Sequence, residues 1–145
     1  MSLHKLCGGI GVAAGIMATF LGGWDAGLQA LLTAMAVDFA LGLMVAGVFK
    51  RSPKSPNGRL ESRAGWKGLC RKIGSLFLVV IAVQLDAASG LTVIRDAVVI
   101  AFLANEVISI TENLGLMGVP IPKAITNAID ILKSKEEQEH EQIHN

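Results

Sequence analysis

Apolar residues dominate four long stretches of the chain, and polar residues gather between and after them. The stretches cover residues 6–23, 26–49, 73–94 and 97–119. A helix needs about 20 residues to cross the hydrocarbon core of a bilayer, so each stretch is long enough to span a membrane. None of them alternates apolar and polar residues as a strand of a membrane barrel does. The pattern predicts an all-α, polytopic transmembrane protein with about four spans.

The charged residues fall mainly into two segments outside these stretches. Eight bases and one acid lie between residues 50 and 72, and four acids lie between residues 136 and 141. Only 17% of all residues are charged, against about a quarter in soluble domains. We therefore expect four parts along the chain. They are a transmembrane hairpin (1–49), a basic loop (50–72), a second transmembrane hairpin (73–119) and a C-terminal segment (120–145).

The basic loop also predicts the orientation in the membrane. Loops rich in Lys and Arg stay on the cytoplasmic side, so residues 50–72 should be cytoplasmic and both termini with them. The turns at residues 22–25 and near Arg95 should then face outward. A cleaved signal peptide is the less favoured alternative, because the A-x-A site at 34–36 lies inside the second stretch. A basic segment between two spans gives no reason to expect nucleic-acid binding.

The loop itself has two parts. Residues 52–58 are Ser, Pro, Lys, Asn and Gly, a composition typical of a mobile linker. Over residues 60–73 a helical wheel places apolar side chains on one side and bases on another, which favours an interfacial amphipathic helix over a solvated loop. The side chains expected at the membrane interface, against anionic headgroups, are Trp66, Arg63, Lys67, Arg71 and Lys72.

The C-terminal segment begins at residues 120–122, Pro-Ile-Pro, where the chain should leave the membrane. Apolar residues recur at helical spacing from Ile125 to Leu132, which predicts a short amphipathic helix over residues 123–135. The acidic tail that follows has the composition of a disordered segment.

Small residues recur every four positions in the first two stretches. In lipid, where apolar burial does not drive helices together, such ridges let two backbones approach closely. Gly11 and Gly15 lie on the first ridge, and Asp38 and Gly42 lie on the second. The ridges predict tight helix packing, either between copies of the chain or within one subunit.

Acids and amides within the predicted spans are the sharpest candidates for function. A carboxylate at the bilayer centre costs about 2.5–3.5 kcal/mol on insertion scales, so it should face protein or water instead of lipid. In the fourth stretch such residues form a polar stripe over roughly a third of the helical wheel. The candidate pore-lining or gating residues are Asn105, Glu106, Ser109, Glu112, Asn113, Asp38 and Asp86. The alternative is a cluster of protonated or paired acids inside one helical bundle.

No motif points to catalysis. The sequence has no G-x-S-x-G, no phosphate-binding glycine loop and no H-E-x-x-H, and His4 is the one histidine outside the tail. The two cysteines, Cys7 and Cys70, are interpreted as reduced thiols. The chain is therefore predicted not to be an enzyme, and no catalytic residue, metal site or cofactor is expected.

Several segments resemble the phage holin family that includes the clostridial toxin-secretion holins. The clearest similarity is ANEVISITENLG at residues 104–115, followed by GVPIP at 118–122. Weaker similarities are VDFALG at 37–42, GWKGLCRKIG at 65–74 and LD at 85–86. Together they cover about residues 35–135.

The resemblance implies a protein that accumulates in the cytoplasmic membrane of a bacterium, forms homo-oligomers and opens lesions. Through these lesions an endolysin would reach the cell wall, so a cell-wall hydrolase is the implied functional partner, without direct contact. Some relatives assist the release of large toxins instead. The residues alone leave two other functions open: a small ion channel or proton-coupled carrier that uses Asp38, Glu106 and Glu112, and a scaffold in which these acids serve packing.

Overall fold

The computed structural model describes residues 2–144, with side chains for residues 2–131, 133 and 134. The elements are α1 (Leu3–Phe20), α2 (Ala26–Met44) with its continuation η1 (Val45–Phe49), α3 (Ser62–Ser89), α4 (Ile94–Leu116) and α5 (Lys123–His144). No strand occurs in this part of the chain. The predicted all-α fold is therefore confirmed.

Four of these helices are long and apolar enough to cross a membrane: α1, α2 with η1, α3 and α4. The second span has the predicted bounds, and the first and fourth begin three residues earlier than predicted, at Leu3 and Ile94. The prediction succeeded because bilayer thickness sets the length of an apolar helix before any tertiary contact forms.

The segment predicted as a separate interfacial helix is the first part of α3. This helix continues without a break from Ser62 to Ser89. Its interior contains glycines but no proline, and an interior glycine costs only about 1 kcal/mol relative to alanine. At 28 residues, α3 is roughly 42 Å long, so it exceeds the hydrocarbon core of about 30 Å. Helix α3 is therefore longer than an untilted helix needs in order to cross the core.

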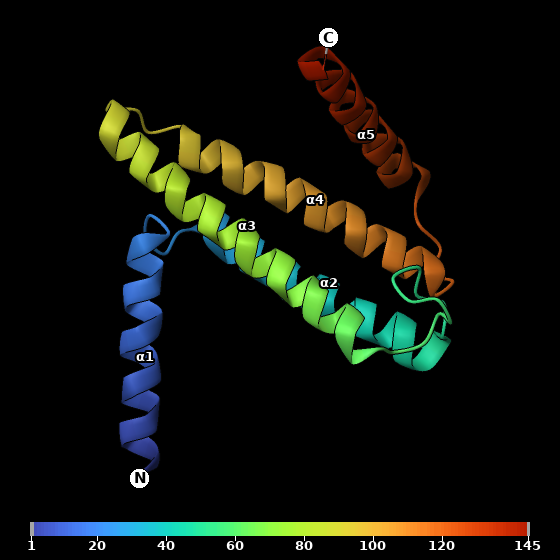
Figure 1. Cartoon of the computed structure of the whole chain (residues 1–145), viewed down its shortest axis with the longest axis horizontal. Helices are drawn as coiled ribbons and strands as arrows, with labels where there is room; N and C mark the ends of the chain where they lie inside the picture. Colours follow the sequence, from blue (N-terminus) through green and yellow to red (C-terminus); the bar gives the residue numbers. More distant parts are fainter. Residues whose placement is uncertain (1, 145) are drawn as a thin grey trace.

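Helices α2, α3 and α4 form a bundle, whereas α1 extends away from it (Figure 1). The buried core joins Leu28 and Leu31 of α2 to Val79 of α3 and Val99 of α4. Helix α1 contributes no buried residue to it. Its apolar side chains consequently lie open to lipid or to another protein.

The loop between η1 and α3 is closed by its own hydrogen bonds, in contrast to the mobile linker expected from composition. The backbone N–H of Ser52 donates to Gly58, that of Gly58 donates to Ser55, and the Ser55 hydroxyl donates to the Arg59 carbonyl at 2.7 Å. Gly58 has a φ of +66°, and a Cβ there would collide with the carbonyl oxygen of Lys50. Turn-forming residues thus build a defined loop here.

Helix α5 begins at Lys123 as predicted but continues to His144, so the expectation of a disordered acidic tail is wrong. Glu, Gln and Lys are strong helix formers, and this propensity extends the helix where hydrophobicity is low. An ion pair between Lys133 of α5 and Glu112 of α4, at 2.5 Å, links the helix to the bundle.

Candidate functional site

Four polar side chains from three helices meet inside the bundle. Lys72 Nζ of α3 donates to Asp38 Oδ2 of α2 at 2.8 Å and to Glu106 Oε2 of α4 at 2.5 Å. Asn113 Nδ2 of α4 donates to the second carboxylate oxygen of Asp38 at 2.9 Å. One cation therefore bridges two acids on different helices. We call Asp38, Lys72, Glu106 and Asn113 the buried polar cluster.

The cluster lies largely out of contact with solvent. The side chains of Asp38, Glu106 and Lys72 are 6%, 12% and 15% exposed. Burying an unpaired charge is costly, and pairing with hydrogen bonds offsets much of that cost. The cluster thus provides each of these acids with a direct counter-charge inside helices long enough to span a bilayer.

Gly42 lies where α2 faces Asn113 of α4. It lies one helical turn after Asp38, and a Cβ at this position would be 4.0 Å from Asn113 Nδ2. The second small-residue ridge therefore packs within the chain. The first ridge differs, because a Cβ at Gly11 or Gly15 would meet no atom within 4 Å.

A polar cleft of about 350 Å³ opens beside the buried polar cluster. It lies between the loop, α3 and α4, and the acids of the cluster form part of its wall. The charged and hydroxyl residues that line the polar cleft are Lys54, Lys67, Arg71, Lys72, Ser75, Asp38, Glu106 and Ser109. The two acids are therefore close to a space that water can enter.

The fold divides the polar stripe predicted on α4. Glu106 and Ser109 line the polar cleft, and Asn113 is buried against α2. Glu112 and Asn105 are exposed. At 100° per residue, Asn105 and Glu112 lie together at one edge of the predicted stripe, and this edge falls outside the buried polar cluster.

Lys72 was expected at the membrane interface, and the structure places it in the buried polar cluster instead. The other four expected interfacial residues, Arg63, Trp66, Lys67 and Arg71, are exposed on α3. Lys72 differs because it lies on the same face of α3 as the core residue Val79. The two residues are seven positions apart, or two helical turns. Treating α3 as one continuous helix would have revealed this shared face.

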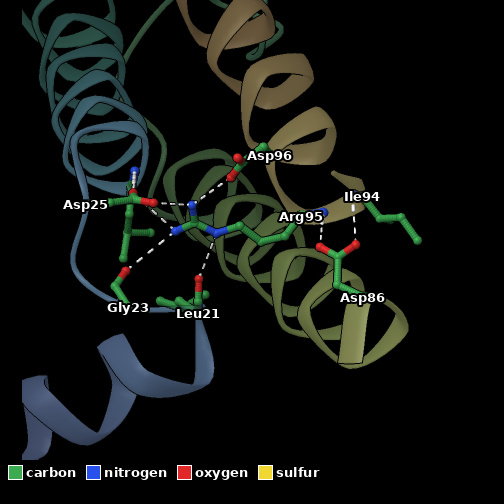
Figure 2. Close-up of polar contacts among 8 residues, drawn as sticks. Leu21, Gly23, Asp25, Asp86, Ile94, Arg95 and Asp96 are labelled. Carbon is green, nitrogen blue, oxygen red and sulfur yellow. Dashed lines mark hydrogen bonds and ion pairs between the residues drawn. The ribbon is translucent and has the colours of Figure 1, made fainter. Parts of the chain in front are cut away.

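A second polar cluster connects the turn between α1 and α2 with the start of α4 (Figure 2). Arg95, which is 7% exposed, donates from Nε to the Leu21 carbonyl at 3.0 Å and from Nη2 to the Gly23 carbonyl at 3.5 Å. Its guanidinium also pairs with the carboxylates of Asp25 and Asp96. One buried arginine therefore fixes this turn, and sequence reasoning did not single it out.

Asp25 has two roles in the second cluster. Besides pairing with Arg95, it caps α2 by accepting a hydrogen bond from the Leu28 backbone N–H at 2.8 Å. The hydrogen bond from Arg95, followed by that from Leu28, holds the pKa of the Asp25 carboxyl below its ordinary value of 3.8. Asp25 is therefore stabilised in its charged form.

Asp86, a candidate gating residue, lies beside this second cluster and away from the first. Its carboxylate accepts hydrogen bonds from the backbone N–H groups of Ile94 at 3.0 Å and Arg95 at 2.9 Å (Figure 2). The first N–H groups of a helix have no partner within the helix, so Asp86 satisfies two donors at the start of α4. In this chain Asp86 caps α4 from the end of α3.

Known proteins resemble this chain over a range that includes both polar clusters. A family model described as the bacteriophage holin family covers residues 15–134. An uncharacterised protein of Halalkalibacterium halodurans is 37% identical over 131 residues, which are 86% of this chain and 91% of that protein. An uncharacterised protein of Listeria innocua is 37% identical over 118 residues, 79% of each chain. A "probable holin" of Bacillus phage phi105 is 35% identical over 115 residues, again 79% of each chain. No solved structure matches.

Proposed function

This chain belongs to the bacteriophage holin family, and we propose that it oligomerises in the bacterial cytoplasmic membrane and opens a lesion there. Family membership implies a membrane protein without enzymatic activity. The lesion would give a cell-wall hydrolase access to the cell wall, with no contact needed between the two proteins. Export of a large toxin would use the same lesion.

The buried polar cluster is the observation that carries the proposal. Replacing a buried ion pair by apolar residues is often neutral or stabilising, so ionic groups are a poor way merely to hold a bundle together. In a membrane they are functional by default. We infer that the single subunit hides these groups and that the assembled lesion turns the same face of α4, with Glu106, Ser109 and Asn113, toward water.

This arrangement makes α4 a two-state element. In the dry state Lys72 pairs with both Asp38 and Glu106, which leaves one acid charge in excess, and in the wet state water solvates the ionised groups. Assembly shifts the population toward the wet state if subunits in that state associate more tightly than subunits in the dry state. Glu112, Asn105 and Asp86 are not part of the dry cluster. Their proposed role as lining residues would therefore require other rearrangements than the opening of the buried polar cluster.

Helix α1 supports the homo-oligomeric part of the proposal. The ridge that carries Gly11 and Gly15 faces no other part of its own chain. Close packing through small residues is a main source of helix association in lipid. A second copy of α1 is the partner that fits this ridge most simply.

The proposed orientation places the basic loop, residues 50–72, and both termini in the cytoplasm. Reporter fusions at residue 56 and at the C-terminus should both give cytoplasmic signals. An external C-terminus together with a cytoplasmic loop would remove α4 as a span, and the proposed lesion with it.

Induced expression in bacteria tests the proposed function directly. We expect growth to continue and then stop abruptly, with entry of a membrane-impermeant dye and release of a cytoplasmic enzyme at the same moment. Co-expression of an endolysin should convert this arrest into lysis. A narrow channel or a carrier would dissipate ion gradients gradually and retain the cytoplasmic enzyme, and that result would overturn the lesion proposal.

A further inference from the structure

We propose that the polar cleft is a binding site for the phosphate of an anionic phospholipid headgroup. The inference needs the chain to be inserted in a bilayer, but it does not need lesion formation. It therefore goes beyond the proposed function and can fail independently of it.

The charges of the polar cleft favour an anion. Four bases and two acids line it, and both acids already pair with one base, Lys72. The three other bases, Lys54, Lys67 and Arg71, form no ion pair among the described residues. Four bases against two acids leave the polar cleft with a net charge of +2, and the bases without an ion pair lie next to the buried polar cluster.

The positions of these bases suit a phosphate. Lys67 and Arg71 are four residues apart on α3, so their side chains lie on the same side of the helix. Lys54 approaches from the hydrogen-bonded loop. A guanidinium binds phosphate oxygens in a bidentate manner and an ammonium adds a point charge. Basic pockets between spans are a recognised means of holding lipid headgroups.

The surroundings favour a lipid over free phosphate. The cleft volume of about 350 Å³ lies within the range of roughly 300–1,000 Å³ found for small-molecule sites. Leu78 follows Arg71 by seven residues, so it lies on the same side of α3 two turns deeper, and it is exposed. An apolar surface directly below a cationic site matches the order of headgroup and acyl chain in a lipid.

Native mass spectrometry of the full chain in detergent tests the site. Phosphatidylglycerol and phosphatidylcholine with identical acyl chains would be added in parallel. We expect retained phosphatidylglycerol and little phosphatidylcholine. The double variant Lys67→Gln/Arg71→Gln should bind phosphatidylglycerol about 30-fold more weakly, because each base near an anionic surface contributes about fivefold to affinity.

Two controls make the result decisive. The double variant Lys50→Gln/Arg63→Gln removes the same charge from bases that do not line the cleft, so it should keep binding. Lys54→Gln changes only the loop and should weaken binding about fivefold without altering helix content by circular dichroism. Equal losses in both double variants, equal binding of the two lipids, or full displacement of the lipid by millimolar inorganic phosphate would each overturn the proposal.

Discussion

The ammonium of Lys72 lies 2.8 Å from the carboxylate of Asp38, although the two residues are 34 positions apart in the sequence. The contact joins α3 to α2, and the bond from Lys72 to Glu106 extends it to α4. All three helices of the bundle therefore meet at one cation. Removing that cation leaves two largely buried acids without their counter-charge.

The first prediction concerns Lys72→Met, which keeps the length of the side chain and removes its charge. We expect the free energy of unfolding to fall by about 3–5 kcal/mol, the usual cost of breaking a buried pair by removing one partner. Titration of the detergent-solubilised protein with SDS would measure it. Arg63→Gln, at an exposed base on the same helix, should change the value by no more than about 0.5 kcal/mol.

A rescue variant separates charge from packing at Lys72. Adding Asp38→Asn and Glu106→Gln to Lys72→Met removes the uncompensated acids as well, so most of the lost stability should return. A triple variant as unstable as Lys72→Met alone would mean that the lysine acts through its alkyl chain.

Asp38 and Lys72 also mark how far the sequence could predict this site. Asp38 could be predicted to face protein, because lipid excludes a carboxylate. Its partner could not be identified from the sequence, because Lys72 belongs to a run of bases. Only the helical register of α3, which continues without a break, shows that Lys72 faces the bundle and that the neighbouring Arg71 does not. Asn113 was found as part of a stripe, but its contact with Asp38 depends on how closely α4 packs against Gly42.

The fold, like the site, could be predicted from the sequence only in part. Hydropathy and bilayer thickness predict the four helices long enough to span a membrane. They do not predict which helices pack together, because every apolar helix can face lipid or protein at similar cost. The separation of α1 from the bundle is such a case, and so is the second cluster around Arg95, which contacts a turn 70 to 74 positions earlier.

The second prediction contrasts the two small-residue ridges. Gly42→Leu should lower the thermal stability of the solubilised monomer, because the new side chain would displace Asn113 and separate α2 from α4. Gly11→Leu and Gly15→Leu should leave it unchanged, because neither position has a neighbour within 4 Å. Chemical crosslinking in membranes should nevertheless show fewer oligomers for the α1 variants. Unchanged oligomers with normal lethality would exclude this ridge from assembly.

The third prediction concerns pH and the turn that carries Asp25. Its pKa is lower in the folded chain than the ordinary value of 3.8. The stabilising contribution of the charged form is therefore present above pH 3.8 and is lost as the pH falls through the lower, folded value. The Asp25 side chain is 48% exposed, so solvent screening limits the contribution to about 1 kcal/mol or less.

Trp24, next to Asp25, provides the signal for this titration. In a Trp66→Phe background its fluorescence should change during acidification below about pH 4. Arg95→Gln should move the transition toward the ordinary carboxyl value, because it removes the main cause of the shift. Asp25→Asn should abolish it. A transition that persists in Asp25→Asn would assign the signal to another acid, such as Asp96.

The last prediction concerns Glu106 and Glu112, two acids of α4 that the sequence pattern assigns to the same polar stripe. Glu106 contacts Lys72 in the buried polar cluster, whereas the Glu112 side chain is 57% exposed and pairs with Lys133 of α5. Glu106→Gln leaves a neutral pair of Lys72 and Asp38 in the dry state and removes a charge that water would stabilise in the wet state. Both effects favour the dry state, so lethality should be delayed or abolished.

Glu112→Gln should shift the time of lethality much less, because an exposed ion pair contributes about 0–1 kcal/mol. Ile110→Leu on the same helix is the volume-matched control and should act like the parent chain. Growth arrest and dye entry would be timed after induction, at equal amounts of membrane-inserted protein by immunoblot. If Glu106→Gln triggers at the parental time, the buried polar cluster serves packing alone and the proposed wet state of α4 fails. If Glu112→Gln delays lethality as strongly as Glu106→Gln, the controlling contact is the one between α4 and α5.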